Sequence, residues 1–332
     1  MSEIFPVLGV DVGGTKIALC LGMSDGKIIS TARIANKDRS SDEVLPEIVT
    51  EGKKLLKAAN IAEDDLKAIG IGAPAPHDIK NGIILNPANM PLWRNVKIKE
   101  YLSKAFNKEV FFNNDANAGA LAEWIFGAGA GGNSMIYLTM STGIGGGIIM
   151  NGSLLEGVGG NAGEMGHFSI DKDGPQCGCG MRGCYVVFCG GRSIANRLKV
   201  ELANQPDNAI VKEAGALENI DMIAVENAVK NGDAFAVNYW DNMMLRNAQA
   251  IGGYMNVFNP ERIVLGTLAW ATGDMFMNPL KKYLPQFAWE ANINECSIEV
   301  SKLGREIGEY AGLAVALYGL YKEDKWQLPW DK

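Results

Sequence analysis

Residues 7–21 read VLGVDVGGTKIALCL, two apolar runs joined by a glycine turn. β-branched and aliphatic residues fill both runs, which is typical of buried strands. The turn consists of Asp11, Val12, Gly13, Gly14, Thr15 and Lys16. Paired glycines let the chain reverse tightly and turn backbone N–H groups toward a phosphate, and a carboxylate at the start of the turn can hold Mg²⁺ through water. The stretch therefore predicts a β-hairpin with a candidate phosphate site, with an ordinary hairpin turn as the alternative.

A second glycine turn lies between the apolar runs 135–140 and 144–150. It contains Ser141, Thr142, Gly143, Gly145 and Gly147. Two such turns at the mouths of two facing lobes could hold a triphosphate from both sides, and phosphoryl transfer is catalysed chiefly by positioning and charge neutralisation. The repeated glycine-cornered hairpin also predicts that one α/β unit is duplicated.

The remaining elements follow from the spacing of apolar residues. Strands are expected at 7–10, 17–21, 28–34, 69–73, 110–113, 135–140, 144–150, 262–266 and 297–301. Helices are expected at 41–60, 97–106, 116–126, 192–203, 220–230, 234–258 and 307–321. A length of 332 residues favours two domains or one large bilobal domain.

The composition disfavours two classes of partner. The net charge is −7, and the chain has no basic run of the kind that releases counterions from nucleic acid. The most apolar late stretch, 310–321, is too short for a bilayer span, which needs roughly twenty residues. The N-terminus lacks the basic region of a signal peptide. We therefore expect no nucleic-acid partner, no membrane partner and a cytoplasmic location.

Three of the six cysteines crowd into one short stretch. The cluster consists of Cys177, Cys179 and Cys184, and His167 precedes it. Three thiolates and one imidazole form a closed tetrahedral set that suits structural Zn²⁺, and clustered cysteines without an export signal more often bind metal than form disulfides. A structural zinc site is predicted, with a chance cluster or a redox pair as the alternatives.

The stretch Asn113-Asn114-Asp115-Ala116-Asn117 falls where an expected strand ends and a helix begins. Asp and Asn at this place are good helix caps. Catalytic groups also collect at strand ends in open α/β sheets. For Asp115 the local sequence leaves both interpretations open.

These motifs resemble those of the ROK family (repressors, open reading frames and kinases). The resemblance is carried by Met140, Gly143, Gly145, Gly147, Ile148, Gly157, Gly163, Gly166 and His167, with the cysteine motif directly after them. The 11–16 turn resembles the family's first phosphate motif, and residues 259–266 resemble its nucleotide-side strand. Similarity thus covers nearly the whole chain.

The resemblance implies an α/β fold of the two-lobed actin-like ATPase (ribonuclease H-like) type, with duplicated βββαβα units and an interlobe cleft. The smaller lobe would comprise 1–118 plus 303–332, and the larger lobe 119–302 with a zinc loop at 164–184. The implied activity is ATP-dependent phosphorylation of a hexose, glucose to glucose 6-phosphate. The alternatives are a kinase for another hexose or an N-acetylhexosamine, or a catalytically weak sugar-sensing protein. ATP, Mg²⁺ and structural Zn²⁺ are the implied cofactors, and a homodimer is expected.

The resemblance also assigns roles to particular residues. Asp115 would be the general base, and the further sugar-binding residues would be Asn89, Asn114, Glu164 and His167. His167 would bind zinc through one nitrogen and touch the sugar through the other. The nucleotide-binding residues would be Asp11, Gly13, Gly14, Thr15, Lys16, Ser141, Thr142, Gly143, Gly145 and Gly266.

The sequence departs from the family pattern at three positions. Val186 stands where glucokinase-like members carry a glutamate that contacts the sugar near C1 and C2. Thr267 replaces the second glycine of a pair, and Ala75 stands where glycine is common. These departures leave the identity of the sugar open. Because only ten residues precede Asp11, a repressor with a DNA-binding domain ahead of it is not expected.

Overall fold

The computed structural model describes residues 3–331 and divides into two compact units. The first unit comprises Met1–Met135, Gly147–Gly163 and Lys302–Lys332. The second comprises Ile136–Gly146 and Glu164–Ser301. Neither unit is continuous in sequence, so residues far apart along the chain complete each of them.

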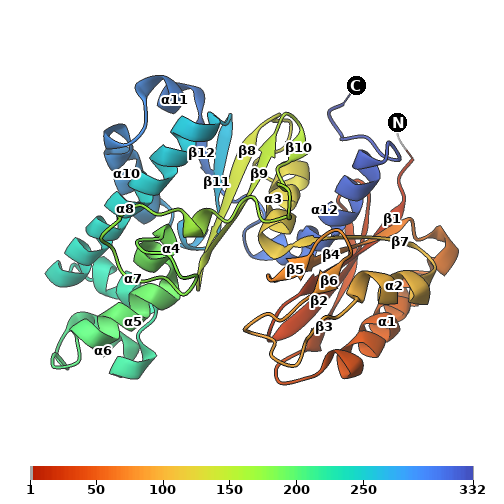
Figure 1. Ribbon diagram of the computed structural model, residues 1–332, viewed down its shortest axis with the longest axis horizontal. Helices are drawn as coiled ribbons and strands as arrows, with labels where there is room; N and C mark the ends of the chain where they lie inside the picture. The colour runs from red at the N-terminus through yellow and green to blue at the C-terminus, as the bar shows by residue number, and fades with distance from the viewer. Residues whose placement is uncertain (1–2, 332) are drawn as a thin grey trace. The chain divides into compact units, whose positions relative to one another are not determined.

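The first unit is built on a five-stranded mixed sheet (Figure 1). Its strands are β1 (Pro6–Val12), β2 (Lys16–Met23), β3 (Ile28–Ala35), β4 (Ala68–Ala73) and β7 (Glu109–Asn114), in the order β3-β2-β1-β4-β7. The hairpins β1-β2 and β2-β3 are antiparallel, whereas β4 pairs in parallel with β1 and β7. The carboxyl ends of β1, β4 and β7 therefore meet at one edge, the usual place for a site in an α/β sheet.

Helices cover both faces of this sheet. α1 (Ser41–Ala58) and α2 (Ile98–Phe106) pack on one face, and α12 (Ile307–Lys322) packs against β1 and β4 on the other, beside α3 (Asp115–Phe126) (Figure 1). α12 approaches the sheet very closely, because a Cβ atom added to Gly70 would lie only 2.0 Å from the carbonyl oxygen of Gly312. Glycine is thus required where the last helix meets the sheet.

A second five-stranded sheet repeats the plan of the first. It contains β8 (Met135–Met140), β9 (Ile144–Met150), β10 (Ser153–Leu154), β11 (Arg262–Leu265) and β12 (Ser297–Val300), in the order β10-β9-β8-β11-β12. Counted along the chain, the strand order within each sheet is 3-2-1-4-5, which confirms the predicted duplication. Two of the divisions between the units fall inside strands of this sheet, after Met135 in β8 and after Gly146 in β9.

The second unit carries most of the remaining helices. They are α4 (Tyr185–Cys189), α5 (Gly191–Glu201), α6 (Ala209–Ala214), α7 (Met222–Lys230), α8 (Ala234–Phe258), α9 (Leu268–Thr272), α10 (Asp274–Tyr283) and α11 (Glu290–Glu295). The expected strands and helices are all present, with ends that differ from the expected ones by at most two residues. The sequence did not predict α4, α6, α9, α10 and α11, the short hairpin β5 (His77–Asp78) and β6 (Ile83–Ile84), or β10.

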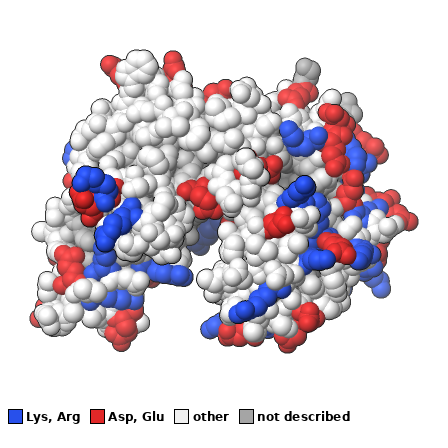
Figure 2. Space-filling model, viewed as in Figure 1, with Lys and Arg blue, Asp and Glu red and all other residues white. Residues whose placement is uncertain are grey.

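The hydrophobicity of the helices and the distribution of surface charge were compared with the sequence-based expectations. Within residues 3–331, no helix has the length and hydrophobicity needed to cross a bilayer. On the face shown in Figure 2, basic side chains lie among acidic ones, and broad areas carry neither.

Candidate active site

The 11–16 glycine turn closes the hairpin between β1 and β2, as predicted. The N–H of Gly13 donates to the carbonyl oxygen of Lys16 at 3.0 Å. Asn36, directly after β3, braces the turn, because its Nδ2 donates to the Gly13 carbonyl at 2.7 Å and its backbone N–H donates to Thr15 at 2.9 Å. Thr15 and Lys16 are exposed. Asn36 was not singled out from the sequence, because its role depends on the pairing of β2 with β3, which brings residue 36 beside residue 15.

Asp11 and Asp115 lie at the same sheet edge, on either side of Gly72 in β4. A Cβ atom added to Gly72 would lie 3.8 Å from Asp11 Oδ1 and 4.0 Å from the Cα of Asp115. Burial, followed by the nearby charge of Asp115, raises the pKa of Asp11 from 3.8 to about 7, and Lys16 partly opposes this rise. Two carboxylates beside a phosphate-type turn are the hard oxygen donors that Mg²⁺ prefers, so the residues fit that ion.

The raised pKa makes stability depend on pH. In the unfolded chain Asp11 loses its proton near pH 4, whereas in the folded chain it holds the proton until about pH 7. The free energy of unfolding therefore falls between these values and is lowest above pH 7. We expect Asp11→Asn to raise the free energy of unfolding at pH 8 by at most about 4 kcal/mol, and the thermal midpoint with it. At pH 4 the substitution should raise neither.

Calorimetry in EDTA at both pH values measures this difference. Asp25→Asn, at an exposed turn, is the matched control and should leave the midpoint unchanged at either pH. An equal effect of Asp11→Asn at pH 4 and pH 8 would show that charge burial at Asp11 does not destabilise the fold.

Asp115 is the first residue of α3 and is exposed. The cap of this helix is Asn114, whose Oδ1 accepts from the backbone N–H of Asn117 at 2.7 Å. Asp115 Oδ1 accepts from the N–H of Ala116 at 2.8 Å, so one carboxylate oxygen is oriented by the backbone. The capping role considered for this stretch thus belongs to Asn114, and the Asp115 side chain projects from the first turn.

Buried Asn113 holds the turn that carries Asp115. Its Oδ1 accepts from the backbone N–H of Asn114 and from Asn117 Nδ2, both at 2.9 Å. Its Nδ2 donates to Glu156 Oε1 at 2.9 Å. Glu156, in the loop after β10, was not singled out from the sequence, and it ties that loop to the end of β7.

Asn89 lies directly against the glycine turn. A Cβ atom added to Gly14 would lie 2.7 Å from the backbone oxygen of Asn89 and 2.9 Å from its Nδ2. The Asn89 side chain is exposed. The first unit therefore places the predicted residues of the 11–16 turn beside Asn89, and Asp11 beside Asp115.

Residues 141–143 of the second glycine turn join β8 to β9 as predicted, and its residues 144–147 already belong to β9. The N–H of Ser141 donates to Gly143 at 2.9 Å. The first residues of α5 fasten to the turn, because the N–H groups of Gly191 and Arg192 donate to the carbonyls of Ser141 and Thr142 at 2.9 and 3.0 Å. Both hydroxyl side chains of the turn remain exposed.

A cavity of about 380 Å³ opens beside this turn. It is lined by Met140, Ser141, Thr142, Gly191, Arg192, Ala195, Asp221, Met222, Ile223, Glu226, Thr267, Leu268 and Ala271. Gly266, at the end of β11, precedes the lining residue Thr267, and a Cβ atom added to Gly266 would lie 2.6 Å from Tyr137 Oη. Apolar walls with hydroxyl groups and a few charges suit a nucleoside with phosphates.

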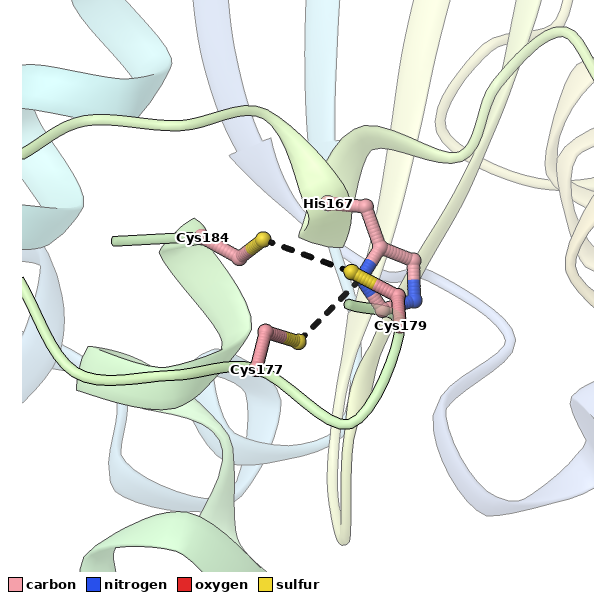
Figure 3. Close-up of side chains that lie close together, drawn as sticks. All are labelled: His167, Cys177, Cys179 and Cys184. Carbon is pink, nitrogen blue, oxygen red and sulfur yellow. Dashed lines mark hydrogen bonds between the residues drawn. The ribbon is translucent and has the colours of Figure 1, made fainter. Parts of the chain in front are cut away.

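His167, Cys177, Cys179 and Cys184 converge in the second unit (Figure 3). Their candidate donor atoms lie within 4.8 Å of one another. Cys177 Sγ is 3.6 Å from His167 Nδ1, and Cys179 Sγ is 3.7 Å from Cys184 Sγ. A tetrahedral zinc site requires about 3.8 Å between two sulfurs and about 3.5 Å between sulfur and nitrogen. The four residues therefore fit a tetrahedral ion such as Zn²⁺, and zinc itself stays a prediction.

The imidazole of His167 presents Nδ1 to the sulfurs, and Figure 3 shows its other nitrogen pointing away from them. Glu164 lies one short turn earlier, since the N–H of His167 donates to its carbonyl at 3.0 Å. This turn rests on the start of β9, because a Cβ atom added to Gly166 would lie 2.2 Å from the Ile144 oxygen. The cluster of His167 and the three cysteines and the glycine turn are thus neighbours in the second unit.

Val186 lies in α4, two residues after Cys184, and is half-buried. Its Cγ2 would be 3.9 Å from a Cβ atom added to Gly143 and 2.9 Å from one added to Gly190. The methyl groups of Val186 therefore lie beside the second glycine turn. Any effect of having valine in place of the family's glutamate arises there.

Comparison with known proteins agrees with this geometry. The ROK family model matches residues 7–317. The glucokinase of Thermotoga maritima is 32% identical over 91% of this chain and 94% of its own length, and the xylose repressor of Caldicellulosiruptor bescii is 28% identical over 91% of this chain and 75% of its own. The structure of a ROK family glucokinase from Streptomyces griseus, in complex with glucose and AMPPNP, has a TM-score of 0.75, 28% identity, and coverage of 94% of this chain and 99% of that one. The chain has the actin-like ATPase fold that its motifs predicted and belongs to the ROK family.

Proposed function

We propose that the chain is a sugar kinase that transfers the γ-phosphoryl group of ATP to a hexose, converting glucose to glucose 6-phosphate. The observation that carries the proposal is the sheet edge of the first unit, where exposed Asp115 and half-buried Asp11 meet beside the 11–16 glycine turn. A base for a sugar hydroxyl and a place for phosphate charge are the two parts that this reaction needs. The likeness to the Thermotoga glucokinase supports the same activity.

In the proposed reaction, Asp115 accepts the proton of the sugar 6-hydroxyl while the hydroxyl oxygen bonds to the γ-phosphorus, the bond from that phosphorus to the β,γ-bridging oxygen breaks, and ADP leaves. Asn89 and Asn114 hold other hydroxyls of the sugar, together with Glu164 and the free nitrogen of His167. The backbone N–H groups of the 11–16 and 141–147 turns, with Lys16, hold the phosphates. When bound beside Asp11, Mg²⁺ would supply positive charge for the phosphate oxygens.

ATP is proposed as the phosphoryl donor because the second unit offers a cavity of nucleoside size beside Ser141 and Thr142. The lobes expected at 1–118 with 303–332 and at 119–302 stay a prediction. The homodimer and the cytoplasmic location likewise stay predictions.

The decisive experiment is ADP release from ATP with a panel of sugars: glucose, mannose, N-acetylglucosamine, N-acetylmannosamine and fructose. Glucose should give the highest kcat/KM, and NMR of the product should place the phosphate on O6. A higher kcat/KM for an N-acetylhexosamine or another hexose would change the proposed substrate but not the proposed kinase activity. Sugar binding without ADP release would instead favour a sensing role.

Val186 provides a separate test of the substrate. A carboxylate at this position would accept hydrogen bonds from hydroxyls near C1 and C2 of the sugar, each contributing roughly 1.5–3 kcal/mol, whereas valine accepts none. We therefore expect an elevated KM for glucose, and we expect Val186→Glu to lower it about ten-fold. Steady-state kinetics on the same sugar panel measures both values.

Val200→Glu is the matched control, because Val200 is 80% exposed on α5 and the same charge is added there. It should leave KM for every sugar unchanged. If the native chain has an ordinary low KM for glucose and Val186→Glu alters neither affinity nor sugar preference, position 186 does not face the sugar.

A further inference from the structure

Thr267 has a backbone conformation that threonine rarely adopts. Its φ is +47° and its ψ is −94°. A β-branched residue at positive φ is a steric outlier, and such residues persist only where the surrounding structure holds them. Gly266 fixes the chain just before it, since its N–H donates to the Leu138 carbonyl at 2.8 Å. The main chain of Thr267 is further tied by its carbonyl, which accepts from the N–H of Ala271 at 2.9 Å.

The side chain of Thr267 is directed by a second hydroxyl. Its Oγ1 lies 3.0 Å from Oγ1 of Thr139 in β8. Between two hydroxyl groups only one proton lies in the shared bond, so one hydroxyl of the pair keeps a proton to donate elsewhere. Thr267 itself is exposed, and it lines the 380 Å³ cavity together with Ser141 and Thr142. Three hydroxyl-bearing residues thus line one cavity.

The rest of the cavity lining differs in chemistry. α7 contributes Met222 and Ile223, and α9 contributes Leu268 and Ala271. Apolar side chains suit the flat face of a base, whereas hydroxyl groups suit the oxygens of a phosphate chain, which accept hydrogen bonds. The lining therefore offers apolar contacts for a base and hydroxyl groups for a phosphate chain, beside the charged residues Arg192, Asp221 and Glu226.

We propose that Thr267 is a nucleotide-binding residue whose hydroxyl, oriented by Thr139, donates a hydrogen bond to the phosphate chain of the nucleoside triphosphate. The strained backbone is the cost in stability of presenting that hydroxyl. This inference rests on the proposed function, because it takes ATP as the occupant of the cavity. It adds a contact made by a side chain where the family pattern has glycine.

Two variants of Thr267 separate the hydroxyl from the strain. Thr267→Val keeps the β-branch and removes the hydroxyl, and Thr267→Gly removes both. By titration calorimetry without sugar, both variants should bind ATP about five- to ten-fold more weakly than the native chain and bind adenosine equally well. Thr267→Gly alone should also raise the thermal midpoint, by about 2–6 °C.

Thr272→Val is the control, since its hydroxyl donates within α9 to Leu268 at 2.8 Å and does not line the cavity. It should bind ATP as the native chain does. Unchanged ATP affinity in both Thr267 variants, an equal loss for ATP and adenosine, or no gain in stability for Thr267→Gly would each overturn the inference and leave the proposed kinase activity standing. Failure of the native chain to bind either ATP or adenosine would overturn both the inference and the proposed kinase activity.

Discussion

Asp115→Asn is expected to lower kcat for sugar phosphorylation by about 10²–10⁴-fold, the usual contribution of a general base. Asparagine has nearly the same shape and can still accept a hydrogen bond from the N–H of Ala116, which Asp115 Oδ1 does at 2.8 Å. It cannot take up a proton. The Kd for the sugar, measured by titration calorimetry, should therefore change little, and the loss should appear in kcat.

Asp42→Asn is the matched control for this substitution. Asp42 lies in the first turn of α1 and is exposed, so the change removes the same charge from the same part of a helix away from the site. It should leave kcat unchanged. Turnover close to that of the native chain in Asp115→Asn, with normal sugar binding, would rule out proton transfer to this carboxylate.

Removal of the metal is expected to have the second large effect. The purified chain should contain about one equivalent of zinc, and Cys184→Ser should lose it. Structural zinc in peptides contributes about 10–16 kcal/mol of apparent binding free energy, so the thermal midpoint should drop steeply with the metal. Because the zinc residues adjoin the Glu164 turn, sugar affinity should fall well before ATP affinity does.

Metal content by mass spectrometry, the midpoint by calorimetry, and the Kd values for sugar and ATP together test this expectation. Cys296→Ser removes a buried thiol of the second unit that does not belong to the cluster, and it should keep one equivalent of metal. Metal-free protein with full activity and an unchanged midpoint would show that the four residues hold no structural ion.

Much of the fold could be predicted because its signals are local. The apolar runs on either side of each glycine turn specify a hairpin wherever they occur, and two copies indicate a duplicated unit. α10 was missed, and Pro279 inside it does not alone explain this, because α1 contains Pro46 and was predicted. The hairpin β5-β6 consists of strands of two residues, which carry no periodicity.

The site was less predictable where it depends on long-range contacts. Asp11, Asp115 and the cysteines stand in motifs whose spacing is visible in the sequence. Asn36 and Glu156 were missed, because each acts through a partner 23 or 43 residues away and nothing in its neighbours marks it. The strain at Thr267 could not be foreseen either, since threonine disfavours that conformation and only the packed structure imposes it.

The packing of α12 on the first sheet also bears on the order in which the two units fold. β1 leaves the ribosome early, yet the helix that covers its inner face begins at Ile307. At roughly 5–20 residues per second, synthesis leaves that apolar face uncovered for on the order of tens of seconds. Most of the second unit, from Glu164 to Ser301, emerges before α12. The first unit to begin synthesis is therefore the last to finish folding, and until then chaperones have access to its sheet.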